Sequence, residues 1–203
     1  MRKSAELRKA EIVATVLEMA DRIGPDRVTT AAVAQQIGVT QAALFRHFPS
    51  KAELWAAVAE QVTDTLATAW RTALEDVSDP LERVRALVAA QLAVIARTPA
   101  IPMLLFSREL TIENDLLRGA FQERLGAFHE MLAADLAAAQ TQGRIPADLA
   151  PRDVAYLLSS LVQGAAIRWA LGARKTSMEE TGLALLDVQL RLLQRQEGSR
   201  RDA

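Results

Sequence analysis

Apolar residues recur every three or four positions along most of this chain, in runs that end at glycine or proline. This period predicts amphipathic helices, and no run alternates as a half-buried strand would. Helices are expected at residues 4–23, 29–38, 40–48, 50–76, 80–98, 113–142, 151–172 and 177–196, with a short segment at 101–110. The sequence therefore predicts an all-α fold.

The stretch from Thr29 to Lys51 joins two short predicted helices through a single glycine. Thr29 or Thr30 offers a side-chain oxygen to the first helix start, and Thr40 does the same for the second. Gly38 can adopt the left-handed conformation that commonly closes a helix. The pattern predicts a helix-turn-helix.

The second of these helices has two faces of different chemistry. Leu44 and Phe48 share one face, which we expect to be buried. Ala42, Ala43 and Arg46 point away from it. Such a face fits a DNA major groove, where arginine can donate twice to guanine and alanine methyls can meet thymine methyls.

Polar residues surround this face. Gln41, in the first turn, is expected to pair with adenine or another base edge. Groups suited to binding phosphate flank the helix at Thr30, Thr40, His47 and Lys51. Two plainer interpretations stay open: any helical hairpin with a tight corner has apolar residues around Gly38, and His47 could be a partly buried, hydrogen-bonded side chain.

Between Thr29 and Leu54 the pattern TT..VA..IGVT...LF.HF.SK.EL resembles the TetR family of bacterial transcriptional regulators. The pattern lies near the amino terminus, after one predicted helix, and about 150 residues of helical sequence follow it, as in that family. The resemblance implies phosphate contacts at Thr30, Thr40, His47 and Lys51 and base contacts at Gln41, Ala42, Ala43 and Arg46. Phe45 stands where the family usually has tyrosine, so one phosphate-contacting hydroxyl is missing.

We expect a DNA-binding domain at residues 1–49, a helical effector-binding and dimerisation domain at 50–196 and a disordered tail at 197–203. The helix that starts at Ser50 would connect the DNA-binding head to the body. The last two predicted helices are apolar on more than one side, which favours pairing with a second copy. A dimer can read two half-sites about 34 Å apart, and the resemblance implies pairing as a four-helix bundle.

The middle helices hold most of the large side chains, and the resemblance makes some of them walls of an effector pocket. The candidates are Trp70, Met103, Phe106, Phe121, Phe128, His129, Gln163 and Trp169. Core packing is the alternative for each aromatic residue. The expected effector is an apolar or aromatic small molecule.

Composition narrows these hypotheses. The chain has no cysteine and only two histidines, far apart, so neither a disulfide framework nor a metal site is expected. The amino terminus lacks the apolar core of a signal peptide, and we expect a soluble, cytoplasmic protein.

Residues 1–51 carry eight Lys and Arg against five Asp and Glu, whereas the rest of the chain carries sixteen Lys and Arg against twenty Asp and Glu. The positive excess thus belongs to the predicted head.

The leading hypothesis is a homodimeric repressor that leaves a palindromic DNA operator when a small effector binds. The alternative is a helical carrier or sensor of hydrophobic ligands without specific DNA binding. An enzyme is not expected, because the sequence has no glycine-rich phosphate loop, nucleophile elbow or metal-ligand cluster, and no cofactor is implied.

Overall fold

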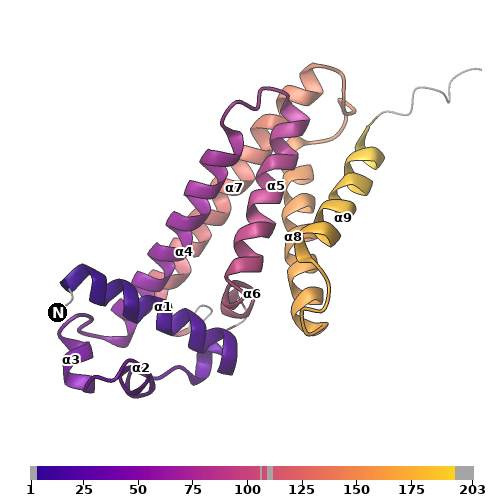
Figure 1. Cartoon of the computed structure of the whole chain (residues 1–203). Helices are drawn as coiled ribbons and strands as arrows, with labels where there is room; N and C mark the ends of the chain where they lie inside the picture. The colour runs from indigo at the N-terminus through magenta and orange to yellow at the C-terminus, as the bar shows by residue number, and fades with distance from the viewer. Residues whose placement is uncertain (1–3, 106, 109–111, 195–203) are drawn as a thin grey trace, which may run out of the picture. The chain divides into compact units, whose positions relative to one another are not determined.

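The computed structural model describes residues 4–105, 107–108 and 112–194 of the chain. Within these residues it contains helices and no strand, which confirms the all-α prediction (Figure 1). The elements are α1 (Ala5–Ile23), the short 3-10 helix η1 (Pro25–Arg27), α2 (Thr30–Gln36), α3 (Gln41–Phe45), α4 (Lys51–Leu74), α5 (Pro80–Arg97), α6 (Ala100–Leu105), α7 (Asp115–Thr141), α8 (Pro151–Leu171) and α9 (Met178–Leu193). The predicted tail at 197–203 and the candidate Phe106 lie outside the described residues.

The chain forms two compact units. Unit 1 consists of Met1–Ala67 and Arg97–Arg124, and unit 2 of Thr68–Ala96 and Leu125–Ala203. Helices α4 and α7 each contribute to both units. The predicted functional boundary after residue 49 stays a prediction, and the compact units divide the chain differently, because residues 97–124 belong with the N-terminal helices.

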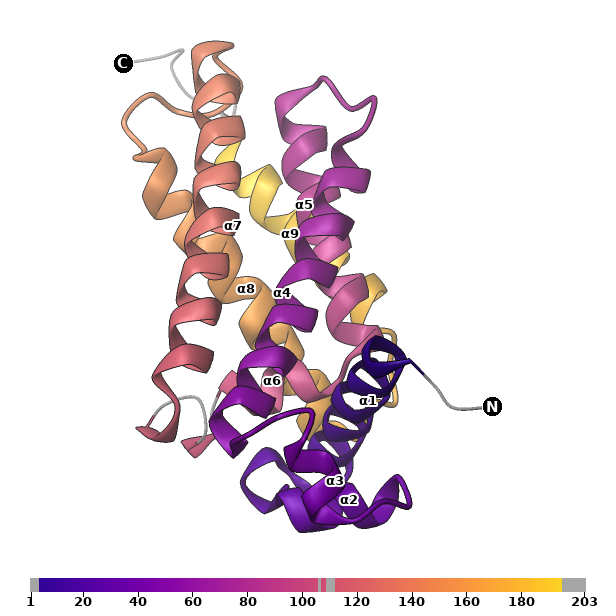
Figure 2. The same cartoon turned by 90° about the vertical axis from the view of Figure 1, so that its left-hand side faces the viewer.

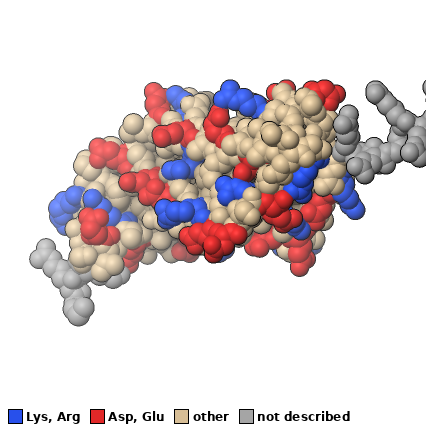
Figure 3. Space-filling view, turned by 90° about the horizontal axis from the view of Figure 1, so that it is seen from above, with Lys and Arg blue, Asp and Glu red and all other residues tan. Residues whose placement is uncertain are grey.

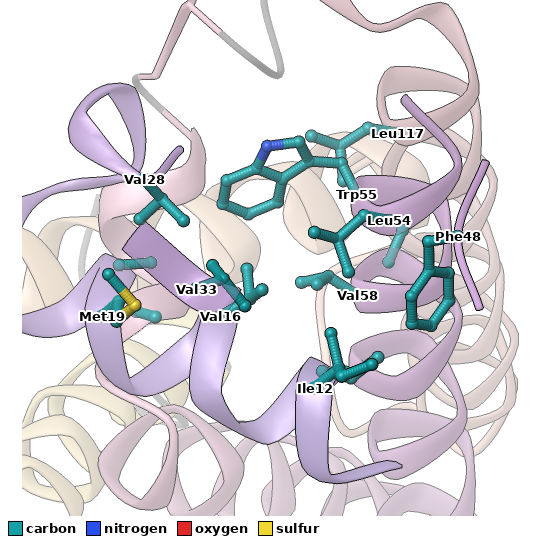
Figure 4. Packing of buried hydrophobic residues seen from close by; sticks show 14 of the residues in the cluster. Ile12, Val16, Met19, Val28, Val33, Phe48, Leu54, Trp55, Val58 and Leu117 are labelled. Atoms are coloured by element: carbon teal, nitrogen blue, oxygen red, sulfur yellow. The ribbon is translucent and has the colours of Figure 1, made fainter. Parts of the chain in front are cut away.

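Unit 1 is built around one hydrophobic core beneath the helix-turn-helix. Ile12 and Val16 of α1, Val33 of α2 and Leu54 and Val58 of α4 are all buried in it (Figure 4). Their spacing of three or four residues within α1 and α4 gives each helix one apolar face. In two views α1, α2 and α3 lie side by side (Figures 1 and 2).

Residues from α6 and α7 complete the same core. Ala100 and Leu104 of α6 are buried in it, and Leu117 of α7 lies beside Trp55 of α4 (Figure 4). Trp55 is 1% exposed and Leu117 is fully buried. The helix-turn-helix is therefore held by segments that lie almost fifty residues or more farther along the chain.

Unit 2 packs around the remaining parts of α4 and α7. The rings of Trp70 in α4 and Phe128 in α7 stack with their centroids 5.1 Å apart. The Nε1 of Trp70 donates a 3.0 Å hydrogen bond to Oε1 of Gln91 in α5. At Gly182 of α9 a Cβ would lie 2.6 Å from the Cδ1 of Leu92, so glycine permits the close approach of α9 to α5.

Helix α3 is shorter than predicted. The sequence pattern predicts a helix to Phe48, but α3 ends at Phe45 and residues 46–47 form a turn. Phe48 precedes Pro49, and the proline ring disfavours the helical conformation at the residue before it. The backbone of His47 still donates to the oxygen of Leu44, at 2.9 Å, so a tightened last turn keeps Phe48 on the buried face.

Helix α8 is long and apolar enough to cross a membrane by length and composition alone. This is weak support for a membrane span, because core helices of soluble proteins meet the same criterion. In unit 2, α8 packs against α9 (Figures 1 and 2). Val154, Leu158 and Val162 of α8 are buried, as expected of a helix that contributes to a protein core.

Candidate nucleic-acid interface

The turn between α2 and α3 has the geometry that the sequence predicts. Gly38 has φ 72°, in the left-handed region. Its backbone N–H donates to the oxygen of Gln35 at 3.1 Å, and that of Val39 donates to the oxygen of Ala34 at 2.9 Å. These two bonds form a Schellman motif, which satisfies the last carbonyls of α2 and sets the direction in which α3 begins.

Both helices of the motif are capped by threonine. Thr29 Oγ1 accepts from the backbone N–H of Ala32, and Thr40 Oγ1 accepts from that of Ala43, each at 3.1 Å. Of the two threonines that could cap α2, it is therefore Thr29 that does so. The hydroxyl of Thr30 is left available for another partner.

The two faces of α3 are separated as predicted. Leu44 is fully buried and Phe48 is 6% exposed, so the apolar face anchors the helix in the core of unit 1. On the outer side Gln41, Ala42 and Arg46 are exposed.

Three other candidate residues of this region have intermediate or marginal exposure. Ala43 and His47 are half-buried, and Phe45 is 37% exposed. A small face with one arginine and little bulk is thus presented to solvent, as entry into a groove requires.

A hydrogen bond joins the two helices across this face. The Nε2 of Gln41 donates to Oγ1 of Thr30 at 2.8 Å. The sequence pattern predicts a base contact for Gln41 and a phosphate contact for Thr30, and it does not predict a contact between the two residues. The bond limits the rotamers of an otherwise mobile side chain, so Gln41 is held in place before any ligand is bound.

Lys51 begins α4 immediately after its capping residue. Ser50 Oγ accepts from the backbone N–H of Glu53 at 3.1 Å, which agrees with the predicted cap. The ammonium of Lys51 lies 4.0 Å from a carboxylate oxygen of Glu113. Nothing in the sequence pointed to Glu113, because the two residues are far apart in the chain and no motif connects them.

The candidate effector residues are divided between the two units. Trp70, Phe128, His129, Gln163 and Trp169 belong to unit 2, whereas Met103 and Phe121 belong to unit 1. Trp70 and Phe128 are buried and stacked, and Gln163 is half-buried. Met103 is 41% exposed, and Phe121 packs on the core of unit 1.

Trp169 and His129 make local contacts within unit 2. The Nε1 of Trp169 donates to the oxygen of Thr176 at 3.0 Å. The ring of His129 meets that of Tyr156 edge-on, with centroids 4.5 Å apart. No described residue hydrogen-bonds to the buried Nε2 of His129. Burial lowers the pKa of His129 below its ordinary 6.5, although the Glu130 carboxylate opposes this, so the ring is neutral at neutral pH.

A groove of about 560 Å³ lies on unit 2 between α5 and α9. Charged residues at its walls include Arg85 and Asp187, which pair at 3.2 Å. None of the candidate effector residues lines this groove. Across the described part of the chain, no group of three His, Asp or Glu side chains is arranged to hold a metal ion.

On one face of the molecule, positive and negative side chains are mixed. Figure 3 shows one face of the molecule, on which Lys and Arg alternate with Asp and Glu. An even mixture of this kind creates no extended field of one sign.

Comparison with known proteins identifies the family. Residues 12–58 match the description of bacterial regulatory proteins of the tetR family. Residues 80–194, more than half of the chain, match the C-terminal region of BetI-type transcriptional repressors. The chain belongs to the TetR family. This membership makes it a regulatory protein rather than an enzyme, in agreement with the sequence analysis.

Individual relatives of this TetR-family chain include the nucleoid occlusion factor SlmA of Vibrio campbellii. It is 35% identical over 130 residues, which are 64% of this chain and 64% of that protein. The SlmA protein of Vibrio vulnificus is 34% identical, also over 130 residues and 64% of each chain. The match thus spans a little less than two thirds of the length of these relatives.

Solved structures share the TetR fold over nearly the whole chain. A transcriptional regulator from Saccharomonospora viridis, solved in complex with choline, has a TM-score of 0.81 at 21% identity, over 94% of this chain and 100% of that one. At this identity the likeness concerns the fold. The placement of the helix-turn-helix at the amino terminus of a helical chain is therefore as the sequence predicts.

Proposed function

We propose that this protein is a homodimeric, effector-responsive transcriptional repressor that acts in the cytoplasm on a palindromic DNA operator. The observation that carries the proposal is the exposed side of α3, where Gln41, Ala42 and Arg46 face solvent while Leu44 anchors the helix from behind. The family matches to regulatory proteins and to BetI-type repressors support the same conclusion.

DNA contacts would divide into two kinds. Arg46 and Gln41 would read base edges, with Ala42 and Ala43 allowing the helix to approach and Phe45 meeting the groove wall. Thr30, Thr40, His47 and Lys51 would hold phosphates and fix the position of the helix without reading sequence. The Thr30–Gln41 hydrogen bond would hold the Gln41 side chain in place on this face.

A second copy would pair through α8 and α9. Both helices expose large apolar side chains although each also contributes to the core of unit 2. On α8, Tyr156 and Leu157 are 55% and 56% exposed, and on α9 Leu192 is 75% exposed. Covering such residues removes apolar area from water, at about 25 cal/mol for each Å². Dimerisation would also give the two recognition helices that a palindrome requires.

The effector would be an apolar or aromatic molecule bound within unit 2. The stacked rings of Trp70 and Phe128 supply apolar surface, and the buried Nε2 of His129 supplies a polar group that a ligand can satisfy. Gln163 and Trp169 are further candidates in unit 2, whereas Phe121 and Met103 belong to unit 1 and Phe106 lies outside the described residues. An effector that prefers the non-binding conformation by about 100-fold would supply roughly 3 kcal/mol of coupling and lower the affinity for the operator by up to about 100-fold.

A second candidate function is binding to many chromosomal sites. The similarity to two proteins named as nucleoid occlusion factors favours it. In such a role the protein would bind DNA of the nucleoid at sites not confined to operators near regulated genes. Chromosome-wide mapping of bound sites in cells distinguishes the two roles by the number and spacing of those sites.

The first experiment is a titration of the full chain against a fluorescent duplex from its own upstream region, with excess random DNA as competitor. The variant Arg46→Ala tests the reading face, and Arg71→Ala, another exposed arginine that lies on α4 outside this face, is the matched control. Competitor-resistant binding that Arg46→Ala abolishes and Arg71→Ala retains supports a specific regulator.

Binding no tighter than to random DNA would be followed by selection from random sequences. Recovery of one palindrome would place the operator elsewhere in the chromosome. Failure to recover any sequence would refute specific DNA binding and favour the carrier hypothesis.

A further inference from the structure

The connection between α6 and α7 brings a carboxylate to the start of α4. Glu113 Oε2 lies 4.0 Å from the Nζ of Lys51, and Glu113 Oε1 accepts a 3.3 Å hydrogen bond from the Nε of Arg108. One carboxylate therefore lies between two cationic groups. The three side chains are between 43% and 67% exposed, so the cluster is open to solvent and to ligands.

Backbone and amide contacts hold Glu113 in this position. The neighbouring Asn114 is 3% exposed, and its Nδ2 donates to the backbone oxygen of Ala52 in the first turn of α4 at 3.1 Å. Its Oδ1 accepts from the N–H of Leu117 at 3.0 Å and so caps α7. Asn114 thus joins the first turns of two helices, and Glu113 is placed beside Lys51 as a result.

Arg108 is fixed from the other side. Its backbone N–H donates to Oδ1 of Asp26 in η1 at 2.9 Å. The side chain of Arg108 is 67% exposed, and the residue belongs to the same compact unit as the helix-turn-helix. Arg108 is consequently a cation attached to the DNA-binding head, although it lies far from the head in sequence.

The amino-terminal end of α4 attracts anions. Unpaired N–H groups at a helix start carry partial positive charge, and the ammonium of Lys51, the first residue of α4, adds a full charge. A cation at this end is unfavourable unless an anion lies close to it. The carboxylate of Glu113 fills that role, and a DNA phosphate has the charge to fill it instead.

The distance favours such an exchange. An optimal charge-assisted hydrogen bond spans about 2.7 to 2.9 Å, whereas Glu113 and Lys51 are 4.0 Å apart. Exposed ion pairs of this kind contribute little to stability. A phosphate could therefore displace the carboxylate at small cost.

We propose that Glu113 substitutes for a DNA phosphate at Lys51 and Arg108, and that DNA binding exchanges the carboxylate for the phosphate backbone. The proposal rests on the proposed DNA binding and adds two residues to that site. Arg108 becomes a phosphate-binding residue, and Glu113 becomes an internal competitor that lowers affinity. Because phosphates carry no sequence information, Glu113 lowers the affinity for all duplexes alike.

The test measures binding of the full chain to a fluorescein-labelled duplex of random sequence, by anisotropy, at salt concentrations from about 50 to about 200 mM. The variant Glu113→Gln removes the competing charge and keeps the shape of the side chain. We expect it to bind about two- to fivefold more tightly than the unmodified chain. Its affinity should also fall more steeply with salt, by up to about 0.9 in the logarithmic slope for each phosphate gained.

Glu123→Gln is the matched control. Glu123 is an exposed residue of α7, the helix that follows Glu113, and the substitution changes the net charge equally. It lies about 12 Å along α7 from the first residue of that helix, beyond the screening length of about 8 Å at physiological salt. The control should bind as the unmodified chain does, and circular dichroism should show the same helix content and melting temperature for both variants.

The substitutions are then combined to identify the cations involved. In a chain that also carries Lys51→Ala and Arg108→Ala, Glu113→Gln should not raise the affinity for the duplex, because the two cations that pair with the carboxylate are absent. An undiminished gain in that background would mean that Glu113 acts by simple repulsion and would overturn the exchange. Equal binding by Glu113→Gln and Glu123→Gln would overturn it as well.

The same titration separates this proposal from the proposed function. If the unmodified chain binds the duplex and Glu113→Gln matches it, the exchange is refuted and DNA binding stands. If neither binds any duplex at low salt, both proposals are refuted.

Discussion

At the scale of single residues, conformation and charge limit what each position of the head can accept. Gly38 turns the chain between α2 and α3 with φ 72°, and a Cβ added there would meet no atom within 4 Å. The requirement for glycine therefore comes from the backbone conformation and not from crowding. At Arg46 and Lys51, in contrast, the requirement is for a positively charged side chain, because each would bind DNA.

We predict that Gly38→Ala destabilises the protein by about 1 to 2 kcal/mol, since an alanine strains the left-handed conformation. The measurement is the free energy of unfolding in urea. Gly119→Ala is the control, because Gly119 lies within α7, also has open space around a built Cβ and has no positive φ. That substitution should stabilise the helix by up to about 1 kcal/mol. Equal effects of the two substitutions would contradict the argument.

Arg46→Ala and Lys51→Ala should weaken DNA binding in different ways. Loss of Arg46 should cost about 1 to 3 kcal/mol on the operator and little on random DNA, because a base contact carries specificity. Loss of Lys51 should weaken binding to both and reduce the salt slope by about 1. Titrations on operator and random duplexes at several salt concentrations separate these outcomes. If Arg46→Ala weakened binding to operator and random DNA equally, Arg46 would not be a base-reading residue.

At the scale of elements, side chains at the helix ends connect neighbouring segments. Asp79 is an example in unit 2: its Oδ1 accepts from the backbone N–H groups of Leu81 and Glu82, each at 3.0 Å, at the start of α5. Its Oδ2 pairs with Arg144, in the segment after α7. One carboxylate thus caps a helix and joins two connections that are far apart in sequence.

This arrangement predicts a dependence of stability on pH. The N–H of Glu82, together with Arg144, holds the pKa of the Asp79 carboxyl below its ordinary 3.8. Because the folded-state pKa is lowered, Asp79 stabilises the protein above pH 3.8, and this stabilisation is lost as the pH falls through the lower value. The melting temperature of Asp79→Asn should be below that of the unmodified chain at neutral pH and should approach it in acid.

Asp148→Asn is the control for this comparison. Asp148 is exposed in the connection between α7 and α8 and has no ion pair among the contacts of the described residues. Its substitution should leave the melting temperature nearly unchanged at either pH. A difference between Asp79→Asn and the unmodified chain that persists below the lowered pKa would show that the carboxylate charge is not what stabilises the cap.

At the scale of the whole molecule, two compact units share two long helices. Helix α4 begins beside the helix-turn-helix and ends in unit 2, and α7 begins in unit 1 and ends in unit 2. Any proposed effect of an effector in unit 2 on DNA binding has these continuous helices as its covalent route. In addition, α8 and α9 leave large apolar side chains exposed to solvent.

We predict that a Leu157→Glu, Leu192→Glu variant is monomeric. Burying the exposed part of each leucine in a dimer contributes about 1 to 2 kcal/mol, so charges at both positions should weaken association by more than tenfold. Light scattering after size exclusion measures the mass, and operator affinity should fall with it. Leu116→Glu, on the 62% exposed Leu116 of α7, is the control and should leave the dimer intact. A dimer that survives in the double variant would exclude the proposed interface.

The sequence by itself determined the features that depend on near neighbours. Contacts within a few residues determine the glycine turn and the buried side of α3. They also determine the helix starts, which are capped by Ser4, Thr40, Ser50 and Ser177. Such contacts repeat at fixed spacing, so the pattern of apolar and polar positions reports them directly. Even the shorter α3 has a local cause, the proline after Phe48.

Only the tertiary structure decided which distant segments meet. Leu117 beside Trp55, the amide of Asn114 on Ala52 and the carboxylate of Glu113 near Lys51 join residues about sixty positions apart. Periodicity gives each helix an apolar face but does not say which other face covers it, because many helix pairs satisfy the same hydrophobic requirement. The Glu113 cluster and the Trp70–Phe128 stack therefore became visible only when the folded chain brought these residues together.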